Sequence, residues 1–273
     1  MFDIPCFIRF RRDGIDNSFH TYRLTAFLGE GSSGRVYQAE RLDSVGLYTV
    51  KIYHNHMDIP SEADIVTVWK RIVDTHIAHG SNEFMHNIEI GTCVPISADE
   101  EASAPPYIGE ELQCQIFFGV VGARINPVKW TVGAKNEKQN EALLKNALEA
   151  YKDCLTALSF IHEAGILHWD INPSNIYSFS VNESERKHNQ FIDLDSAVEV
   201  SDILSGKHNI YSCATTGVWY TGREKTAYAN LIENGETDLV YVLDNTAIAR
   251  VLLFMLTGTT RSERIETLCK KFS

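Results

Sequence analysis

The stretch ILHWDINPSNIY, from Ile166 to Tyr177, decides how this chain is interpreted. It places Asp170 and Asn175 five positions apart, and the Asn-Pro step between them favours a turn. A carboxylate can accept or orient the proton of a hydroxyl group, and an amide oxygen nearby can bind a metal ion. The alternative is an ordinary loop with capping side chains and with His168 packed in the core. We favour a loop that carries chemistry, because the two residue types stand at the spacing that phosphoryl transfer uses.

Two helices are predicted around this loop. The first ends at Gly165, and its apolar residues recur every three to four positions, as on the buried face of an amphipathic helix. These residues are Leu144, Ala147, Leu148, Tyr151, Leu155, Leu158 and Ile161. The second, at 245–256, is apolar nearly all round and ends at Gly258, so it is expected to be buried.

An acidic motif follows the loop. The stretch FIDLD, from Phe191 to Asp195, places carboxylates directly after a short apolar strand. Mg²⁺ prefers hard oxygen ligands and commonly takes one or two protein groups together with phosphate oxygens. Asp193 and Asn175 meet that requirement, and Asp195 is a further candidate ligand. The alternative is that Asp193 and Asp195 simply lie at a solvated strand end. This interpretation is less favoured once the preceding loop is accepted as a site.

The first half of the chain is predicted to be rich in strands, at 22–28, 35–41 and 47–53. Between the first two strands, glycines follow the pattern G-x-G-x-x-G-x-V, which lets the backbone approach phosphates. The pattern consists of Gly29, Gly31, Gly34 and Val36. Lys51 ends the third strand, where an inward-facing ammonium could bind nucleotide phosphates. Without a ligand, these features would be a glycine-rich hairpin and a solvated lysine.

The region between these motifs is harder to interpret. A helix is predicted to begin at Pro60 and Ser61 and to continue to Gly80, and a buried strand is predicted at 113–121. Acidic residues and alanines at 99–106 predict a surface loop. The chain therefore has a β-rich first half and a helix-rich second half.

Composition and charge narrow the class of protein. The formal net charge of -11 disfavours binding to nucleic acid and suits a protein partner with a basic or neutral surface. The six cysteines form no CxxC pair, and the N-terminal residues lack the order of a signal peptide. The longest apolar run, 247–256, is interrupted by Arg250 and is too short to span a bilayer. We therefore expect a soluble, cytoplasmic protein with no membrane span.

Taken together, these motifs resemble the eukaryotic-type protein kinase superfamily over roughly residues 20–260. The glycines and Lys51 match its glycine-rich loop and third-strand lysine, His168-Trp-Asp170 matches H-R-D, and Asn175 matches the catalytic-loop asparagine. Asp193-Leu-Asp195 stands where D-F-G is expected, Tyr220 and Glu224 are in register with Y-x-A-P-E, and Asp244 stands where a buried helix binds the loop backbone.

The resemblance implies an α+β, bilobal protein-kinase-like fold. Residues 1–19 would be an N-terminal extension, 20–124 a small β-rich N-lobe and 125–273 a mostly helical, C-terminally truncated C-lobe. It implies a protein kinase that transfers the γ-phosphate of ATP to serine or threonine, with Mg²⁺ (Mn²⁺ as an alternative) on Asn175 and Asp193. Asp170 would act on the acceptor hydroxyl.

Departures from the family pattern qualify this interpretation. Trp169 replaces the arginine that would bind an activation-loop phosphate, so constitutive activity is the simpler expectation. Asn172 replaces a lysine, which removes a cation from the transferring phosphoryl group, and Asp195 replaces a glycine. The chain stops about 15 residues after Gly258, so Glu224 is expected to lack its usual arginine partner. This shortening resembles kinases of bacterial effectors and some viruses, which would place the protein in a host cytoplasm.

Several alternatives remain open. The glutamate that pairs with Lys51 is assigned to Glu62, with Glu83 and Glu89 as alternatives, and the adenine-contacting hinge is placed near 118–123. The chain could instead be a small-molecule phosphotransferase, whose relatives often lack the lysine at position 172. It could also be a nucleotide-binding pseudokinase that acts as a scaffold. An activator or regulator protein is a further expected partner.

Overall fold

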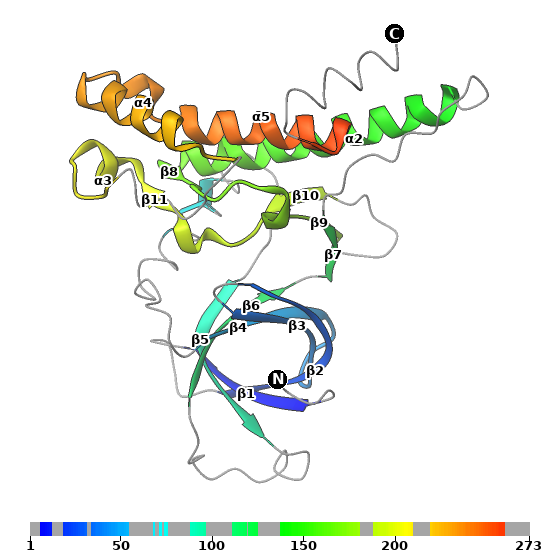
Figure 1. Ribbon diagram of the computed structural model, residues 1–273. Coiled ribbons are helices and arrows are strands. Elements are labelled where there is room, and N and C mark those ends of the chain that lie inside the picture. The colour runs from blue at the N-terminus through cyan, green and yellow to red at the C-terminus, as the bar shows by residue number, and fades with distance from the viewer. Residues whose placement is uncertain are drawn as a thin grey trace. The chain divides into compact units, whose positions relative to one another are not determined.

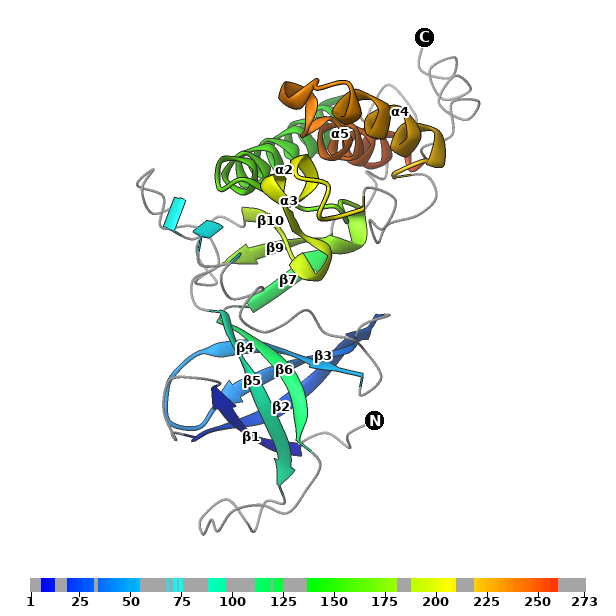
Figure 2. The ribbon, with the colours of Figure 1, turned by 90° about the vertical axis from the view of Figure 1, so that its left-hand side faces the viewer.

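The computed structural model describes residues 6–12, 19–31, 34–54, 68, 71–72, 74–75, 88–96, 111–118, 120–124, 137–180, 188–209 and 219–259 (Figures 1 and 2). These residues divide into two compact units, with the boundary between Val121 and Gly122. The second unit holds everything described after that boundary except Phe179 and Ser180. Each unit is described by itself.

The first unit is a closed barrel with the strand order β1-β2-β3-β4-β6-β5. Its strands are β1 (Cys6–Arg12), β2 (Phe19–Glu30), β3 (Gly34–Arg41), β4 (Leu47–Tyr53), β5 (Ile88–Ile96) and β6 (Leu112–Phe118). All six pairings are antiparallel. The predicted strands at 22–28, 35–41 and 47–53 are confirmed, because each lies within an observed strand.

Pairing between β1 and β5 closes the barrel, with Arg12 opposite Gly91 and Arg11 opposite Thr92. A Cβ atom at Gly91 would lie 2.0 Å from the carbonyl oxygen of Arg11, so only glycine permits this approach. The β-rich first half is thus confirmed, but a closed barrel is not typical of a protein kinase lobe. Residues 6–12 form one of its strands, although the sequence analysis assigned them to an extension.

Side chains alternate between the interior and the outer surface of the barrel. The interior is apolar and includes Ile8, Phe10, Tyr22, Leu24, Tyr37, Ala39, Tyr48, Val50, Ile52, Cys93, Cys114 and Ile116. In β4, Val50 and Ile52 belong to this interior, so Lys51 between them lies on the outer face.

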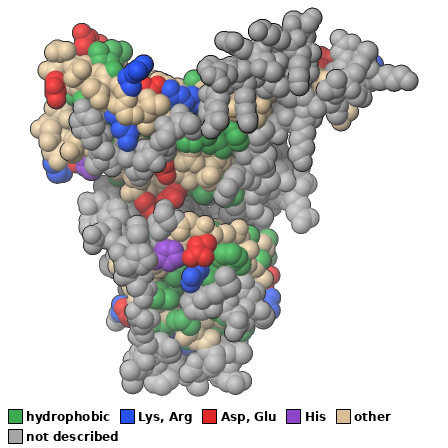
Figure 3. Space-filling view, viewed as in Figure 1, with side chains coloured by type: hydrophobic (Ala, Val, Ile, Leu, Met, Phe, Trp, Pro, Cys, Tyr) green, Lys and Arg blue, Asp and Glu red, His purple; other side chains and the backbone are tan. Residues whose placement is uncertain are grey.

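The second unit combines helices with two small sheets. Its first elements are α2 (Glu137–Glu163), β8 (Ile166–Leu167), η3 (Pro173–Asn175), β9 (Ile176–Ser180), β10 (His188–Phe191) and η4 (Leu194–Ser196). They are followed by β11 (Val198–Glu199), α3 (Val200–Leu204), α4 (Gly222–Glu233), η6 (Thr237–Leu239) and α5 (Val242–Thr257). The sheets are β11-β8 and β10-β9-β7, in which β7 (Val120–Arg124) begins two residues before the boundary of the unit. Figure 3 shows acidic and basic side chains interspersed over the α3–α4 end.

The buried face of α2 differs from the predicted apolar stripe. Leu144, Leu148 and Leu155 are 39%, 46% and 43% exposed. Three residues of the predicted stripe, Ala147, Leu158 and Ile161, are buried, and so are Cys154, Ala157 and Phe160 of α2 and Ala164 directly after it. Many of them are small, which allows α2 to pack closely on α5 and β10. Helical spacing alone could not distinguish these two neighbouring stripes.

The helical stretch Thr237–Thr257, which contains α5, is long and apolar enough to cross a membrane, contrary to the expectation from the sequence. In this unit, however, Asp244 of α5 is fully buried and hydrogen-bonded, and Arg250 is paired with Glu224. A core helix passes the same test of length and composition, and buried, paired polar side chains such as these also occur in core helices.

Candidate functional site

Strand register aligns three of the predicted nucleotide-binding residues on the barrel. Gly29 of β2 lies opposite Val36 of β3, and Val36 lies opposite Lys51 of β4. Lys51 in turn lies opposite Gln115 of β6. Directly opposed residues in antiparallel strands share one face of the sheet. The row therefore joins a glycine, a valine, a cation and an amide on the outer face.

Lys51 is almost fully buried on that face, at 6% exposure, and its Nζ lies 4.8 Å from the ring centroid of Tyr53. Gln115 is 2% exposed, and its Nε2 has no hydrogen-bond partner among the described residues. Burying an amide without a hydrogen-bond partner costs free energy. Sequence analysis missed Gln115, although a glutamine between apolar residues in a predicted buried strand was a usable signal.

The glycines of the turn between β2 and β3 differ in whether the fold requires glycine at their position. The backbone N–H of Gly31 donates to the carbonyl oxygen of Gly34 at 2.9 Å. A Cβ at Gly34 would lie 2.3 Å from the carbonyl oxygen of Ile52, so packing against β4 requires glycine there. A Cβ at Gly29 would meet nothing within 4 Å. The fold itself does not require glycine at position 29, which leaves room for a ligand to approach the backbone.

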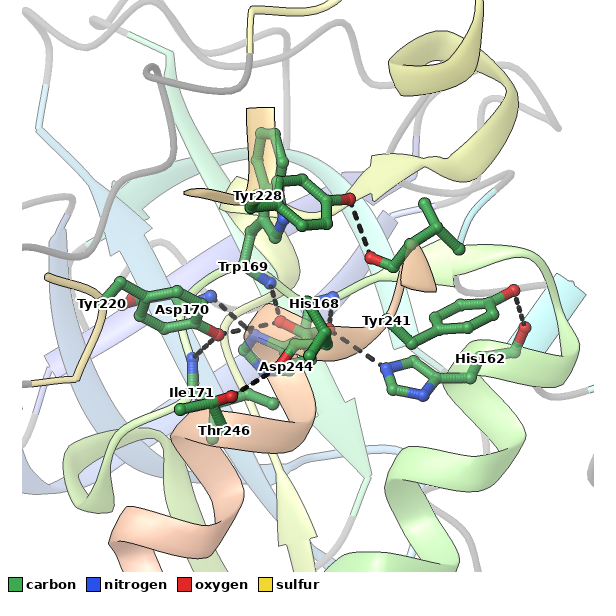
Figure 4. Close-up of polar contacts among 12 residues, drawn as sticks. His162, His168, Trp169, Asp170, Ile171, Tyr220, Tyr228, Tyr241, Asp244 and Thr246 are labelled. Atoms are coloured by element: carbon green, nitrogen blue, oxygen red, sulfur yellow. Dashed lines mark hydrogen bonds and ion pairs between the residues drawn. The ribbon is translucent and has the colours of Figure 1, made fainter. Parts of the chain in front are cut away.

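In the second unit, the buried carboxylate of Asp244 holds the backbone of the loop (Figure 4). It accepts hydrogen bonds from the backbone N–H of His168 at 2.8 Å and of Trp169 at 3.2 Å. It also accepts from Tyr220 Oη at 2.8 Å and lies 3.2 Å from His162 Nε2. Burial raises the pKa of Asp244, but the hydrogen bond and charge of His162 and the interactions with His168 outweigh it, so the pKa lies below its ordinary value.

Trp169 takes a left-handed backbone conformation, with φ 57°, and its side chain is fully buried. Such a conformation costs a non-glycine residue on the order of 1 kcal/mol or more and persists only where the surroundings enforce it. The two hydrogen bonds to Asp244 supply that constraint at Trp169 and its neighbour His168. The loop is thereby turned so that Asp170 follows in a defined direction.

Asp170 is held by two asparagine amides. Asn175 Nδ2 donates to Asp170 Oδ2 at 2.6 Å and to its carbonyl oxygen at 2.9 Å. Asn172 Nδ2 donates to Asp170 Oδ1 at 3.1 Å, and Asn172 Oδ1 caps η3 by accepting from Ser174 N at 2.8 Å. The structure therefore brings the predicted pair together. It also gives Asn172, noted only as a missing lysine, a role in orienting the carboxylate.

The residues near Asn175 carry oxygen atoms of the kind that a hard cation such as Mg²⁺ prefers. The Nδ2 of Asn175 is engaged by Asp170, whereas its Oδ1 accepts no hydrogen bond within the described part of the chain. The backbone N–H of Ile192 donates to the carbonyl oxygen of Asn175 at 2.9 Å. Asp193 is the next residue after Ile192, so this bond holds the backbone beside Asp193 next to Asn175. Asp193 has φ 63°, a second left-handed non-glycine residue, and Asp195 lies in η4. Amide and carboxylate oxygens are the ligands that Mg²⁺ prefers.

Tyr220 contacts groups that organise this loop, and Glu224 caps the start of α4. Tyr220 Oη accepts from the backbone N–H of Ile171 at 3.1 Å while it donates to Asp244. Burial and the Asp244 carboxylate raise the pKa of Tyr220 well above its ordinary value, so the hydroxyl keeps its proton. Glu224 is paired with Arg250 of α5, so the expectation that it lacks an arginine partner was wrong.

Sequence analysis also missed His162 and the function of Arg250. His162 lies in the last turn of α2, stacks on Tyr241 with ring centroids 4.3 Å apart, and contacts Asp244. Nothing in its local sequence marks that contact. Arg250 did carry a signal, because a single charge in an otherwise apolar buried helix requires a partner.

The predictions between β4 and β7 fall partly outside the described residues. Glu62 and Glu83 lie outside the described residues, and of Glu89 only the backbone, in β5, is described. Val68, Arg71, Ile72, Asp74 and Thr75 are helical, within the predicted 60–80 helix. Of the hinge at 118–123, the backbone is described except at 119. Lys51 belongs to the first unit, whereas the Asp170 loop belongs to the second.

Comparison with known families supports the kinase resemblance at a coarse level. A family described as fungal protein kinase matches residues 137–219, which contain α2, the Asp170 loop and the Asp193 motif. The sequence analysis expected a resemblance to kinases of bacterial effectors and some viruses, and the matching family is neither of these. A search of curated proteins found no match to this chain.

Proposed function

We propose that this protein is an ATP- and Mg²⁺-dependent protein kinase that phosphorylates serine or threonine in a protein substrate. The observation that carries the proposal is the Asp170–Asn175 hydrogen bond of 2.6 Å, on a loop whose backbone is fixed by Asp244. The kinase-family match over residues 137–219 supports the same class of reaction. A substrate with a neutral or basic surface suits the net charge of -11.

Asp170 would act on the acceptor hydroxyl in this reaction. Its carboxylate orients the hydroxyl and takes its proton while the oxygen forms a bond to the γ-phosphorus and the bond to ADP breaks. The amides of Asn172 and Asn175 fix the carboxylate, so little reorganisation is needed when the acceptor arrives. His168 is unsuited to be the proton acceptor in place of Asp170, because it is fully buried and its Nδ1 accepts the Asp170 N–H.

The remaining predicted residues would bind the nucleotide and metal. Lys51 would hold nucleotide phosphates, and the open space at Gly29 would admit them to the backbone. Asn175 Oδ1 and Asp193, with Asp195 as a further ligand, would hold Mg²⁺ or Mn²⁺, which neutralises charge on the phosphates. The buried Trp169 occupies the place of a phosphate-binding arginine, which favours activity without phosphorylation of the protein itself.

The test is transfer of labelled γ-phosphate by the purified protein to itself, to mixed protein acceptors and to small-molecule acceptors. We expect labelled protein with phosphoserine or phosphothreonine on hydrolysis. Asp193→Ala and Asp170→Asn should abolish the label, whereas Asp238→Ala, an exposed aspartate on η6, should not.

The outcomes separate the alternatives. Label only in small molecules would replace the protein-kinase proposal with a small-molecule phosphotransferase. ATP binding without transfer to any acceptor would favour a scaffold. Binding is measured by the rise in melting temperature with ATP, with and without Mg²⁺.

A further inference from the structure

The outer face of the barrel holds a buried amide to which the proposed function gives no role. Gln115 of β6 is 2% exposed, and its Nε2 has no hydrogen-bond partner among the described residues. A buried donor without a partner has lost its bonds to water and gained none in return, so it destabilises the fold. Such groups are rare in folded proteins, and a functional role is one reason why they are kept.

Gln115 lies directly opposite Lys51 on the neighbouring strand β4 (Figure 1). Directly opposed residues of antiparallel strands share one face of the sheet and have Cβ atoms about 5 Å apart. The residues on either side of both belong to the barrel interior, namely Val50, Ile52, Cys114 and Ile116. The ammonium of Lys51 and the amide of Gln115 therefore project from the same patch of the outer face.

The two side chains present the same kind of hydrogen-bonding group. The ammonium of Lys51 has donors and no acceptor, and Nε2 of Gln115 is also a donor, so these two groups cannot satisfy each other. One acceptor atom placed between them would satisfy both. Because one of the donors is a cation, an anionic oxygen suits this place best, and the low exposure of both side chains strengthens its attraction to the ammonium.

We propose that Gln115 is a phosphate-binding residue that shares an oxygen atom of the nucleotide with Lys51. This inference rests on the proposed function and deepens it by adding a neutral donor to the nucleotide site. Strand register places Gly29 and Val36 in the same row, and a Cβ at Gly29 would meet nothing within 4 Å, so the row has room for a ligand. All four residues belong to the first unit.

The first test compares Gln115→Met with Gln113→Met. Gln113 is exposed and lies two residues earlier on β6, so it shares the outer face and provides a matched control. Calorimetric titration measures the affinity for ATP with Mg²⁺, for inorganic tripolyphosphate and for adenosine. We expect Gln115→Met to weaken binding of ATP and tripolyphosphate by about tenfold, as loss of one hydrogen bond to a charged group does.

Adenosine identifies the part of the nucleotide that Gln115 contacts. Its affinity should be the same for the wild type and Gln115→Met, because adenosine carries no phosphate. Gln113→Met should bind all three ligands like the wild type. A loss of adenosine affinity as large as the loss of ATP affinity would mean that Gln115 contacts the nucleoside, and would overturn the assignment.

A second measurement needs no ligand. Gln115→Met removes a buried donor that has no partner, so the free variant should melt at a higher temperature than the wild type. Saturating ATP should narrow or reverse this difference, because it binds the wild type more tightly. The competing explanation is that the amide turns so that its Oε1 accepts from Lys51. Gln115→Met would then melt at a lower temperature than the wild type, which would contradict the inference.

The double variant Lys51→Met with Gln115→Met tests whether the two residues act on one oxygen. Residues that bind the same group are coupled, so the loss of ATP affinity should be smaller than the product of the two single losses. A loss equal to that product would mean that they bind separate groups, and the shared oxygen would be ruled out.

The outcomes separate this inference from the proposed function. If the wild type binds ATP and transfers phosphate while Gln115→Met binds ATP equally well, the inference is wrong and the function stands. If tripolyphosphate binds to the wild type and less tightly to Gln115→Met, but no acceptor is phosphorylated, the phosphate site stands and the proposed function fails. If the wild type binds neither ATP nor tripolyphosphate, both proposals fail.

Discussion

The barrel face and the Asp170 loop place their polar residues by different means. On the barrel, Gly29, Val36 and Lys51 are aligned by strand pairing, so their positions follow from register. In the loop, Asp170 is oriented through a left-handed tryptophan and a carboxylate that is 76 positions away from His168 in the sequence. The barrel face is built from residues on adjacent, paired strands, whereas the Asp170 loop depends on contacts between segments that are far apart in the sequence. The two regions should therefore fail differently when single residues are changed.

The largest expected effect is the loss of stability in Asp244→Ala. The buried carboxylate accepts from two backbone amides and a tyrosine hydroxyl, and it contacts His162. Its removal leaves these buried donors unsatisfied, so the free energy of unfolding should fall by about 3–5 kcal/mol. Urea denaturation measures it, with the exposed Asp238→Ala as control. A loss no greater than that of the control would show that the loop does not depend on this long-range contact.

Lys51→Met tests the barrel face next. Removing a cation that contacts phosphate should weaken ATP binding by roughly 10- to 100-fold, because hydrogen bonds to charged groups contribute about 1.5–3 kcal/mol. The barrel should keep its melting temperature, since register and not Lys51 holds the strands. Calorimetric titration with ATP and Mg²⁺ measures the affinity, with the exposed Lys152→Met as control. Unchanged affinity would remove Lys51 from the candidate site.

Two glycine substitutions separate packing from ligand access within the same turn. Gly34→Ala should destabilise the protein by about 1–3 kcal/mol, since its Cβ would lie 2.3 Å from the backbone oxygen of Ile52. Gly29→Ala should change stability by no more than about 0.5 kcal/mol, because its Cβ meets open space. It should nevertheless weaken ATP binding. Denaturation and nucleotide titration of both variants decide this, and equal losses of stability would contradict it.

The smallest expected effect is the loss of the stabilising contribution of Glu224 at low pH. The pKa of Glu224 is lowered to about 2 in the folded protein, first by the hydrogen bond from Arg250, against an ordinary value of 4.5. A carboxylate with a depressed pKa stabilises the fold above its unfolded pKa and loses that contribution as the pH falls through its folded pKa. The pair is partly exposed to solvent, which limits its contribution to about 1 kcal/mol or less.

Glu224→Gln checks this prediction. The wild type should be more stable than the variant at neutral pH, and the difference should shrink between pH 4.5 and pH 2. Melting curves recorded across that range give the difference directly. A difference that stays constant with pH would mean that the charge of Glu224 contributes nothing.

The sequence predicted the features that depend on neighbouring residues and missed those that depend on contacts between distant segments. Asp170 and Asn175 could be identified because their spacing is local, and the barrel strands could be identified from alternation. Closure by β1 could not, because it depends on one glycine, Gly91, that admits a distant strand. The contacts of Asp244 with His162 and of Arg250 with Glu224 join segments far apart in sequence, and local spacing carries no record of them. The α2 stripe was predicted only in part: Leu144, Leu148 and Leu155 are exposed, because neighbouring rows on a helix share nearly the same period.

Closure of the barrel limits how another protein chain can bind to it. Every strand of the barrel is hydrogen-bonded to a neighbour on both sides, so the barrel presents no free edge to a strand from another chain. An extended peptide cannot add itself to this sheet by backbone pairing, which is a common way for proteins to capture a substrate or a second copy. A partner that docks on the described strands of the barrel must therefore be recognised through side chains and loops.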